Sequence, residues 1–230
     1  MPKMGFGKRQ EPGDGMAETY VHHRISTAPR AWQTVAGRLS DRREALAKGS
    51  GALYGVWRSQ IGRPRDELTA VTVWSVPITA ERAQAALTDG IPDIAQAESA
   101  AMAATLRPSD AQPPVRQGNY AFRWFETPEK DWPEFLDLCA QAWPGFESAY
   151  DSQVIGLWRC ADGKAGNVRS LLLTRRPNLA MWERSKLPQG AAETAVRDAL
   201  SRRYDLCTWT VVYTTTLLTA TDATDDARWT

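Results

Sequence analysis

An internal repeat constrains the fold of this chain more than any other feature of its sequence. The segment TYVHHRIST at 19–27 aligns with NYAFRWFET at 119–127, which places Tyr20 and Tyr120 at an offset of 100 positions. The same offset separates several further identical pairs along the chain: Trp32 and Trp132, Pro77 and Pro177, Leu87 and Leu187, Gly90 and Gly190. Ordered self-similarity of this length indicates a duplicated structural unit.

A Gly-x-Trp motif strengthens the repeat. The segment YGVWR at 54–58 aligns with IGLWR at 155–159, one residue further along than the offset of 100. A single-residue slip in a loop accounts for the difference. Gly and Trp share one face of a strand at this spacing, because strand side chains alternate. Trp57 and Trp158 are therefore expected either to anchor the core or to line a ligand pocket beside the glycine.

Each repeat predicts the same succession of elements. An aromatic and β-branched run is followed by a helix, two strands with a turn-rich connection, a second helix and a last strand. In repeat two, Pro144 and Gly145 are expected to end the first helix. In repeat one, the second helix is predicted over TAERAQAAL at 79–87 and extends into IAQAESAAM, leaving a weak last strand near MAATLRP. The order β-α-β-β-α-β is the ferredoxin-like pattern.

Two such units in one chain predict the fold class. One unit covers a single sheet face with its two helices, so its other face needs a partner. Tandem units supply that partner, which predicts an α+β fold in which two ferredoxin-like repeats form an intrachain dimeric α+β barrel-like pseudo-dimer. The expected boundaries are a flexible tail, repeat one, a proline-containing linker, repeat two and a flexible acidic tail: 1–16, 17–107, 108–118, 119–218 and 219–230.

Composition narrows the functional classes. Lys+Arg 28 against Asp+Glu 27 gives a net charge of +1, which argues against a nucleic-acid partner. No apolar run is long enough to span a membrane, and the N-terminus lacks the apolar core of a secretory signal. Three cysteines without CxxC spacing suit a reducing compartment, so a cytoplasmic location is expected. The chain shows none of the common catalytic signatures and no zinc-ligand set, so no metal or cofactor is predicted.

The first three strands of each repeat resemble those of the NIPSNAP-like families of the dimeric α+β barrel superfamily. The segments that carry the resemblance are YVHHRI, GVWRSQIG and DELTAVTVWS, and again YAFRWF, GLWRCADG and NVRSLLLTR. Relatives in that superfamily include cofactor-free monooxygenases, haem-binding enzymes and binding proteins, so the resemblance implies a fold more firmly than a chemistry. Repeat one departs from the pattern, because His23 stands where repeat two has Arg123.

Strand alternation sorts the candidate site residues. His22 and His23 are adjacent and point to opposite faces, so they cannot share one metal ion. If His23 faces the barrel interior, Arg123 lies at the pseudo-symmetric position, and the two could orient a ligand carboxylate or carbonyl. Trp57 and Trp158 would line that pocket. Tyr20 ranks lower as a ligand contact because it points away from His23. The alternative for each residue is a purely structural role, which is the commoner outcome for buried histidines and indoles.

Three functions remain open at this stage. The first is a NIPSNAP-like protein that binds a small apolar or aromatic molecule. The second is a cofactor-independent monooxygenase or related oxidoreductase or isomerase. The third is an interaction protein with no small-molecule site. The sequence leaves open whether the chain is an enzyme and whether it forms a homo-oligomer.

Overall fold

The computed structural model describes residues 18–222 and shows an α+β fold, as the sequence predicts. The first half of the chain contains four strands and three short helices, which follow one another along the sequence: β1 (Thr19–Thr27), α1 (Trp32–Ser40), α2 (Arg43–Lys48), β2 (Gly51–Ile61), β3 (Glu67–Trp74), α3 (Ala80–Thr88) and β4 (Ile94–Arg107). The second half has the same number of strands, with one α-helix after its first strand and two after its third: β5 (Asn119–Pro128), a 3-10 turn η1 (Glu129–Asp131), α4 (Trp132–Tyr150), β6 (Gln153–Cys160), β7 (Asn167–Arg176), α5 (Leu179–Arg184), α6 (Gly190–Asp205) and β8 (Trp209–Leu217).

The eight strands close into one antiparallel barrel in the order β1-β3-β2-β8-β5-β7-β6-β4. The last strand of each half closes the barrel by pairing with the other half. Met102 of β4 lies opposite Cys160 of β6, and Leu217 of β8 lies opposite Trp57 of β2. Every strand therefore has two neighbours, and no exposed sheet edge runs the length of the barrel.

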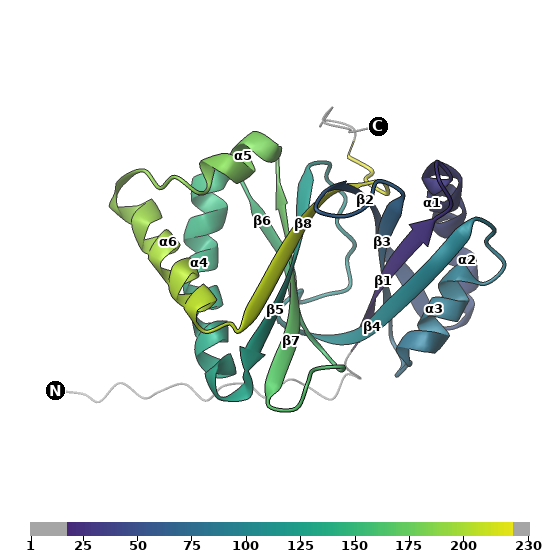
Figure 1. The fold of residues 1–230 in the computed structure, drawn as a ribbon, viewed down its shortest axis with the longest axis horizontal. Helices are drawn as coiled ribbons and strands as arrows, with labels where there is room; N and C mark the ends of the chain where they lie inside the picture. The colour runs from purple at the N-terminus through teal and green to yellow at the C-terminus, as the bar shows by residue number, and fades with distance from the viewer. Residues whose placement is uncertain (1–17, 223–230) are drawn as a thin grey trace.

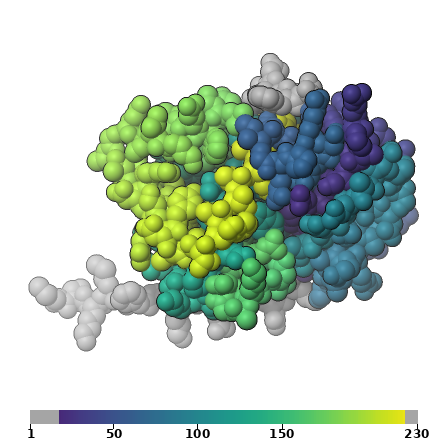
Figure 2. Space-filling view, viewed as in Figure 1, coloured from purple at the N-terminus to yellow at the C-terminus, as the bar shows by residue number. Residues whose placement is uncertain are grey.

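The helices cover the outside of the barrel in two separate layers. Figure 1 shows α1, α2 and α3 against the first-half strands, with α4, α5 and α6 on the opposite side of the molecule. In the space-filling view the yellow C-terminal segment lies between the helices of the second half and the blue first half (Figure 2). Apolar side chains form three cores as a result: one inside the barrel and one beneath each helical layer.

Two local predictions are wrong. Helix α4 continues through Pro144 to Tyr150 instead of ending at Pro144-Gly145. Trp143, Phe146 and Tyr150 on either side of this point are buried, so their packing outweighs the missing proline donor. The segment IAQAESAAM is not helical but belongs to β4, which runs from Ile94 to Arg107. Alanine has little strand preference of its own, and pairing with β1 and β6 on both sides decides the conformation.

The two predicted tails fall wholly or mostly outside the described residues, so residues 1–16 and 223–230 are not discussed further. Within residues 18–222, no helix combines the length and the apolar character that crossing a membrane demands.

Candidate functional site

The alternation predicted for the first strand is confirmed. Tyr20 belongs to the aromatic core inside the barrel, and the His22 ring contacts the rings of Phe122 and Trp124 there. Val21 and Ile25 instead pack beneath the helices of the first half. His23 shares their face, so the conditional expectation that His23 faces the barrel interior is wrong.

A continuous hydrogen-bond chain holds His23 beneath α3. Trp74 Nε1 donates to Thr72 Oγ1, which lies 2.9 Å from His23 Nε2. His23 Nδ1 lies 2.7 Å from Ser99 Oγ, and that hydroxyl donates to Gln84 Oε1. The indole can only donate, so the chain runs in one direction: the Thr72 hydroxyl donates to Nε2, and Nδ1–H donates to Ser99. Both ring nitrogens of His23 are therefore occupied within the protein.

Both histidines make the fold sensitive to acid. Burial lowers the pKa of His23 to about 3, and burial together with neighbouring cationic groups lowers the pKa of His22 to about 3. In the unfolded chain both histidines take up a proton near pH 6.5, whereas in the folded chain they do so only near pH 3. The free energy of unfolding is therefore highest above pH 6.5 and decreases as the pH falls toward 3. We expect a loss of up to about 1.4 kcal/mol per pH unit for each histidine. Urea unfolding of His23→Gln between pH 7 and pH 4 should show a shallower loss than the parent; parallel curves would contradict this role.

Arg123 lies in the other half of the molecule. It is on the helix-covered face of β5, with its guanidinium carbon 5.2 Å from the centre of the Tyr204 ring in α6. Strands β1 and β5 are not neighbours in the barrel. The expectation of one pocket formed by His23 and Arg123 is therefore wrong: the two residues occupy matching positions, but each lies beneath its own helical layer.

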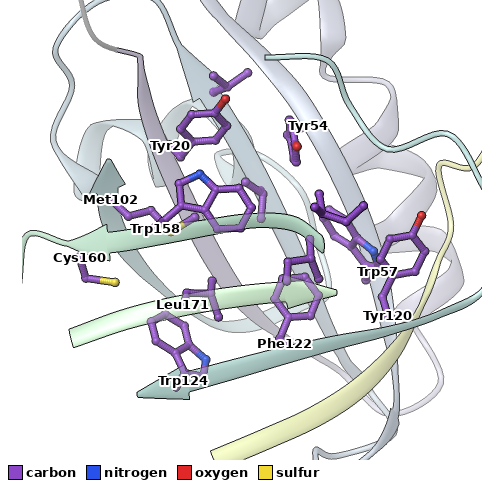
Figure 3. Packing of buried hydrophobic residues seen from close by; sticks show 14 of the residues in the cluster. Tyr20, Tyr54, Trp57, Met102, Tyr120, Phe122, Trp124, Trp158, Cys160 and Leu171 are labelled. Carbon is purple, nitrogen blue, oxygen red and sulfur yellow. The ribbon is translucent and has the colours of Figure 1, made fainter. Parts of the chain in front are cut away.

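The other three predicted residues belong to the one apolar core inside the barrel. Tyr20, Trp57 and Trp158 are almost fully buried, and Tyr20 lies 5.5 Å from Trp158 between ring centres (Figure 3). Each indole folds back over the glycine two positions before it, so closely that a Cβ on Gly55 or Gly156 would overlap the ring. The Gly-x-Trp motif thus provides room for the indole, and these residues build the interior core rather than the pocket described next.

A pocket lies between the second-half strands and their helices. We call it the cationic pocket. Its floor comes from alternate residues of β5 and β7, its walls from α4 and α6, and its rim from α5 and the loop that follows. The cavity volume is about 40 Å³, and the empty space that includes the open mouth is about 530 Å³. Its lining combines cationic and aromatic side chains: Arg123, Arg176, Lys186, Arg197, Arg203, Trp143, Phe146, Trp182 and Tyr204.

Positive charge in this pocket is not balanced by carboxylates. Five cationic side chains line it, and none of its lining residues is acidic. Within residues 18–222, none of these five makes an ion pair: Arg123, Arg176, Lys186, Arg197 and Arg203. Some half-buried arginines elsewhere do pair, as Arg107 does with Glu147 at 2.6 Å. Two of the five pocket cations, Arg176 and Arg203, are buried, and their hydrogen-bond partners are the neutral groups Thr174 Oγ1 and Cys139 Sγ. Because a buried charge without a counter-ion costs several kcal/mol, such a cluster indicates a site for an anion.

Unpaired donors point into the same pocket. Four buried N–H groups of its lining find no acceptor in the described part of the chain: Trp143 Nε1, Trp182 Nε1, Arg176 Nε and Arg203 Nε. Arg203 is 2% exposed and Arg176 is 7% exposed, so bulk water does not satisfy them. Buried polar groups nearly always have a partner, and all four here are donors. The pocket therefore lacks hydrogen-bond acceptors, which an oxyanion provides.

The electrostatics shift the ionisation of three groups. Burial and nearby arginines lower the pKa of Lys186 to about 8 and that of Arg176 to about 10. For Tyr204, burial alone raises the pKa, but the charges of Arg203, Arg123 and Lys186 outweigh it and bring the pKa below its ordinary value. The pocket thus favours negative charge on any group that enters it.

A hollow at one end of the barrel offers a contrast. It has a volume of about 240 Å³ and is lined by His22, three arginines and two carboxylates. Its charges are paired: Arg24 lies 2.8 Å from Glu67, and Arg169 lies 2.5 Å from Asp162. His22 Nε2 lies 3.1 Å from the Tyr213 hydroxyl. Because its charged groups already have protein partners, this hollow does not require a ligand to balance them. The cationic pocket is therefore the stronger candidate for a ligand site.

Tyr204 is the one side chain in the lining of the cationic pocket of a type that commonly ligates haem iron. The lining contains no histidine, cysteine, methionine or carboxylate. His22 and His23 both belong to the first half and are occupied by protein partners. In residues 18–222 no three His, Cys, Asp or Glu side chains gather closely enough to hold a metal ion.

Sequence reasoning identified only Arg123 among the residues of this pocket. Arg176 ends β7 on the same face as Leu172 and Thr174, so alternation along NVRSLLLTRR could have placed it beside Arg123. Lys186 follows a short helix in a loop, and no periodic signal marks it.

No protein-family model matches the sequence, and no curated protein matches it. Solved structures do match its fold. An anthrone oxidase-like protein superposes with a TM-score of 0.60 at 12% identity, over 89% of this chain and 92% of that chain. A candidate monooxygenase from Lactobacillus acidophilus NCFM gives 0.53 at 7% identity, over 86% and 93%. A chlorite dismutase variant from Candidatus Nitrospira defluvii gives 0.53 at 8% identity, over 87% and 90%.

These likenesses define the class of fold. The chain has the fold of the dimeric α+β barrel proteins. Identities of 7–12% carry no information beyond the fold.

Proposed function

We propose that the chain binds a small aromatic molecule as its anion, a carboxylate, phenolate or enolate, in the cationic pocket. The observation that carries the proposal is the set of four N–H donors without an acceptor, in a pocket whose five cationic side chains make no ion pair among residues 18–222. The aromatic part of the ligand packs against Trp143, Trp182 and Phe146. Its oxygens accept hydrogen bonds from Arg176 and the indoles, which removes the cost of leaving these donors buried and unsatisfied.

Calorimetric titration with 1-naphthoate tests this proposal, with 1-naphthalenemethanol as a matched neutral compound of the same ring size. The account predicts saturable binding of the carboxylate and at least tenfold weaker binding of the alcohol, since each charge-assisted hydrogen bond contributes about 1.5–3 kcal/mol. Equal affinity for both compounds, or no binding of either, would contradict it.

Affinity for the anion should fall as the pH rises from 7 to 9. Lys186 has a pKa of about 8 and carries its charge only below that pH. An anion binds more tightly to the protonated form, so binding weakens as the ammonium group loses its proton. The titration repeated at pH 7, 8 and 9 checks this. The Lys186→Met variant should bind more weakly at pH 7 and show a flatter profile; an unchanged slope in that variant would assign the pH dependence to another group.

Oxidation of the bound anion by O₂ is the second candidate, favoured by Tyr204. In its phenolate form, stabilised by the neighbouring cations, the Tyr204 oxygen can accept a proton from an acidic substrate. An electron-rich carbanion or enolate then reduces O₂ directly. For an anthrone-type substrate the ring CH₂ becomes C=O, one oxygen atom entering the product and the other leaving as water. The names of two structural neighbours, anthrone oxidase-like protein and candidate monooxygenase, agree with this chemistry.

An oxygen electrode distinguishes binding from oxidation. Oxygen uptake with anthrone that depends on the protein and falls at least tenfold in Tyr204→Phe supports the oxidoreductase. If the protein binds 1-naphthoate but causes no oxygen uptake with anthrone, the oxidation is refuted and the binding function remains.

The proposal includes two further expectations from the sequence, a tandem duplication and a NIPSNAP-like role. The two halves share the order of their strands and helical regions and the offset of 100, which supports a tandem duplication that forms an intrachain pseudo-dimer. A NIPSNAP-like role rests only on the resemblance of the strand segments. In the proposed pseudo-dimer the anion pocket belongs to the second half, because His23 and its partners occupy the matching place in the first half.

A further inference from the structure

Lys186 differs from the other lysines that the structure describes. Lys48, Lys130 and Lys164 are exposed on the surface, and none of them lines the cationic pocket. The Lys186 amine instead lies 5.3 Å from the centre of the Trp182 ring, at the rim of that pocket. It has no carboxylate partner within residues 18–222 to hold it in the charged form.

The surroundings of Lys186 favour its neutral form. Burial disfavours the ammonium ion of Lys186. The Tyr204 oxygen favours it, and the charges of Arg123, Arg197 and Arg176 disfavour it, so that the net effect lowers the pKa of Lys186 to about 8. A lysine amine is a nucleophile only after it loses its proton, and desolvation beside other cations is an established way of activating one. Lys186 therefore loses its proton at a lower pH than an ordinary lysine, whose pKa of about 10.4 leaves it almost wholly protonated near neutral pH.

We propose that Lys186 forms an imine with an aromatic aldehyde or ketone that also carries an anionic group. The neutral Nζ attacks the carbonyl carbon, a proton moves from nitrogen to oxygen to give a carbinolamine, and loss of water leaves a C=N bond. No oxidant or reductant takes part. Arg123 and Arg176 hold the anionic group, the ring packs beside Trp182, and the carbonyl group then faces Nζ. The proposal rests on the proposed function, because that anion site positions the carbonyl compound.

Reductive trapping tests the imine directly. The protein is incubated with 4-carboxybenzaldehyde and sodium cyanoborohydride at pH 7.5, and the modified lysines are identified by peptide mass spectrometry. Lys186 should be labelled at least tenfold faster than Lys130 or Lys164 in the same sample. Excess benzoate should suppress only the labelling of Lys186, and benzaldehyde, which lacks the carboxylate, should label it no faster than the surface lysines. Uniform labelling of all lysines would overturn the proposal, as would labelling of Lys186 that is indifferent to the carboxylate.

Two variants separate this inference from the proposed function. Lys186→Met should still bind 1-naphthoate by calorimetry, although more weakly, and should lose only the fast adduct. Arg123→Gln keeps the amine and should reduce its labelling by 4-carboxybenzaldehyde to the rate of the surface lysines. Binding of 1-naphthoate to the parent without fast labelling of Lys186 refutes the imine and leaves the anion site standing. If the parent neither binds 1-naphthoate nor shows fast labelling of Lys186, both the anion site and the imine are refuted.

Discussion

Trp57→Ala should lower the free energy of unfolding by about 3–5 kcal/mol, the range for removing a large aromatic side chain from a close-packed core. The Trp57 indole is fully buried inside the barrel, with its ring centre 5.2 Å from that of Phe122 and 5.9 Å from that of Tyr120. Alanine leaves a cavity that the rigid barrel strands cannot fill. Urea unfolding measured by circular dichroism gives the change; a loss below about 1 kcal/mol would mean that the indole lines an open pocket instead.

A double-mutant cycle with Gly55 isolates the contact inside the Gly-x-Trp motif. Gly55→Ala alone should cost about 1–3 kcal/mol, because its Cβ overlaps the Trp57 indole. In the Trp57→Ala background the same substitution should cost much less, since the overlapping ring is absent. Gly37→Ala in α1 is the matched control: nothing lies within 4 Å of the added Cβ, so stability should be unchanged or slightly higher. Additive losses in the cycle would contradict the steric explanation.

Arg176→Met should lower the affinity for 1-naphthoate by about ten- to a hundredfold and at the same time stabilise the free protein. The first effect follows from losing a charge-assisted hydrogen bond of about 1.5–3 kcal/mol. The second follows because Arg176 is 7% exposed, lies near Arg123 and has no ion-pair partner among the described residues. Removing such a charge should raise the free energy of unfolding by about 1 kcal/mol or more. Calorimetry and urea unfolding of one preparation measure both.

Arg58→Met is the control for this variant. Arg58 is 9% exposed, and its guanidinium carbon lies 3.9 Å from the centre of the Trp32 ring in the first half, outside the cationic pocket. Binding of 1-naphthoate should not change in this variant. A fall in stability for Arg176→Met with unchanged affinity would show that Arg176 serves the fold rather than a ligand.

The α+β fold was predictable because the sequence patterns that indicate its strands and helices are local, and because they occur twice in the chain. The offset of 100 gives the repeated element order, and alternation along TYVHHRIST separates Tyr20 from His23 correctly. Alternation does not show which of the two faces of a strand points into the barrel. The side of β1 that faces the barrel interior is decided by closure of eight strands from both halves, which is a tertiary property. For that reason the sequence leaves it conditional whether His23 faces the interior, and the structure places it on the outer face, beneath α3.

The cationic pocket could not be read from the sequence for a related reason. Its cationic residues come from β5, β7, α6 and the loop after α5. They are too far apart in the sequence to form a recognisable motif. Lysines and arginines on a helix or strand usually belong to a solvated face. Only the packing of α6 on the strands shows that Arg203 is buried, 2% exposed, against the rings of Phe125 and Tyr204.

The most direct measurement of the central claim is an NMR titration of the indole N–H signals with 1-naphthoate. Trp143 and Trp182 have unpaired Nε1 donors in the cationic pocket, whereas Trp57 and Trp158 have equally unpaired donors inside the barrel. Substitution of each tryptophan assigns its signal. The account predicts that the Trp143 and Trp182 signals shift with saturation as they gain an oxygen acceptor, while those of Trp57 and Trp158 stay in place. Shifts confined to the barrel pair, or no shifts at saturating ligand, would contradict an anion site between the second-half strands and their helices.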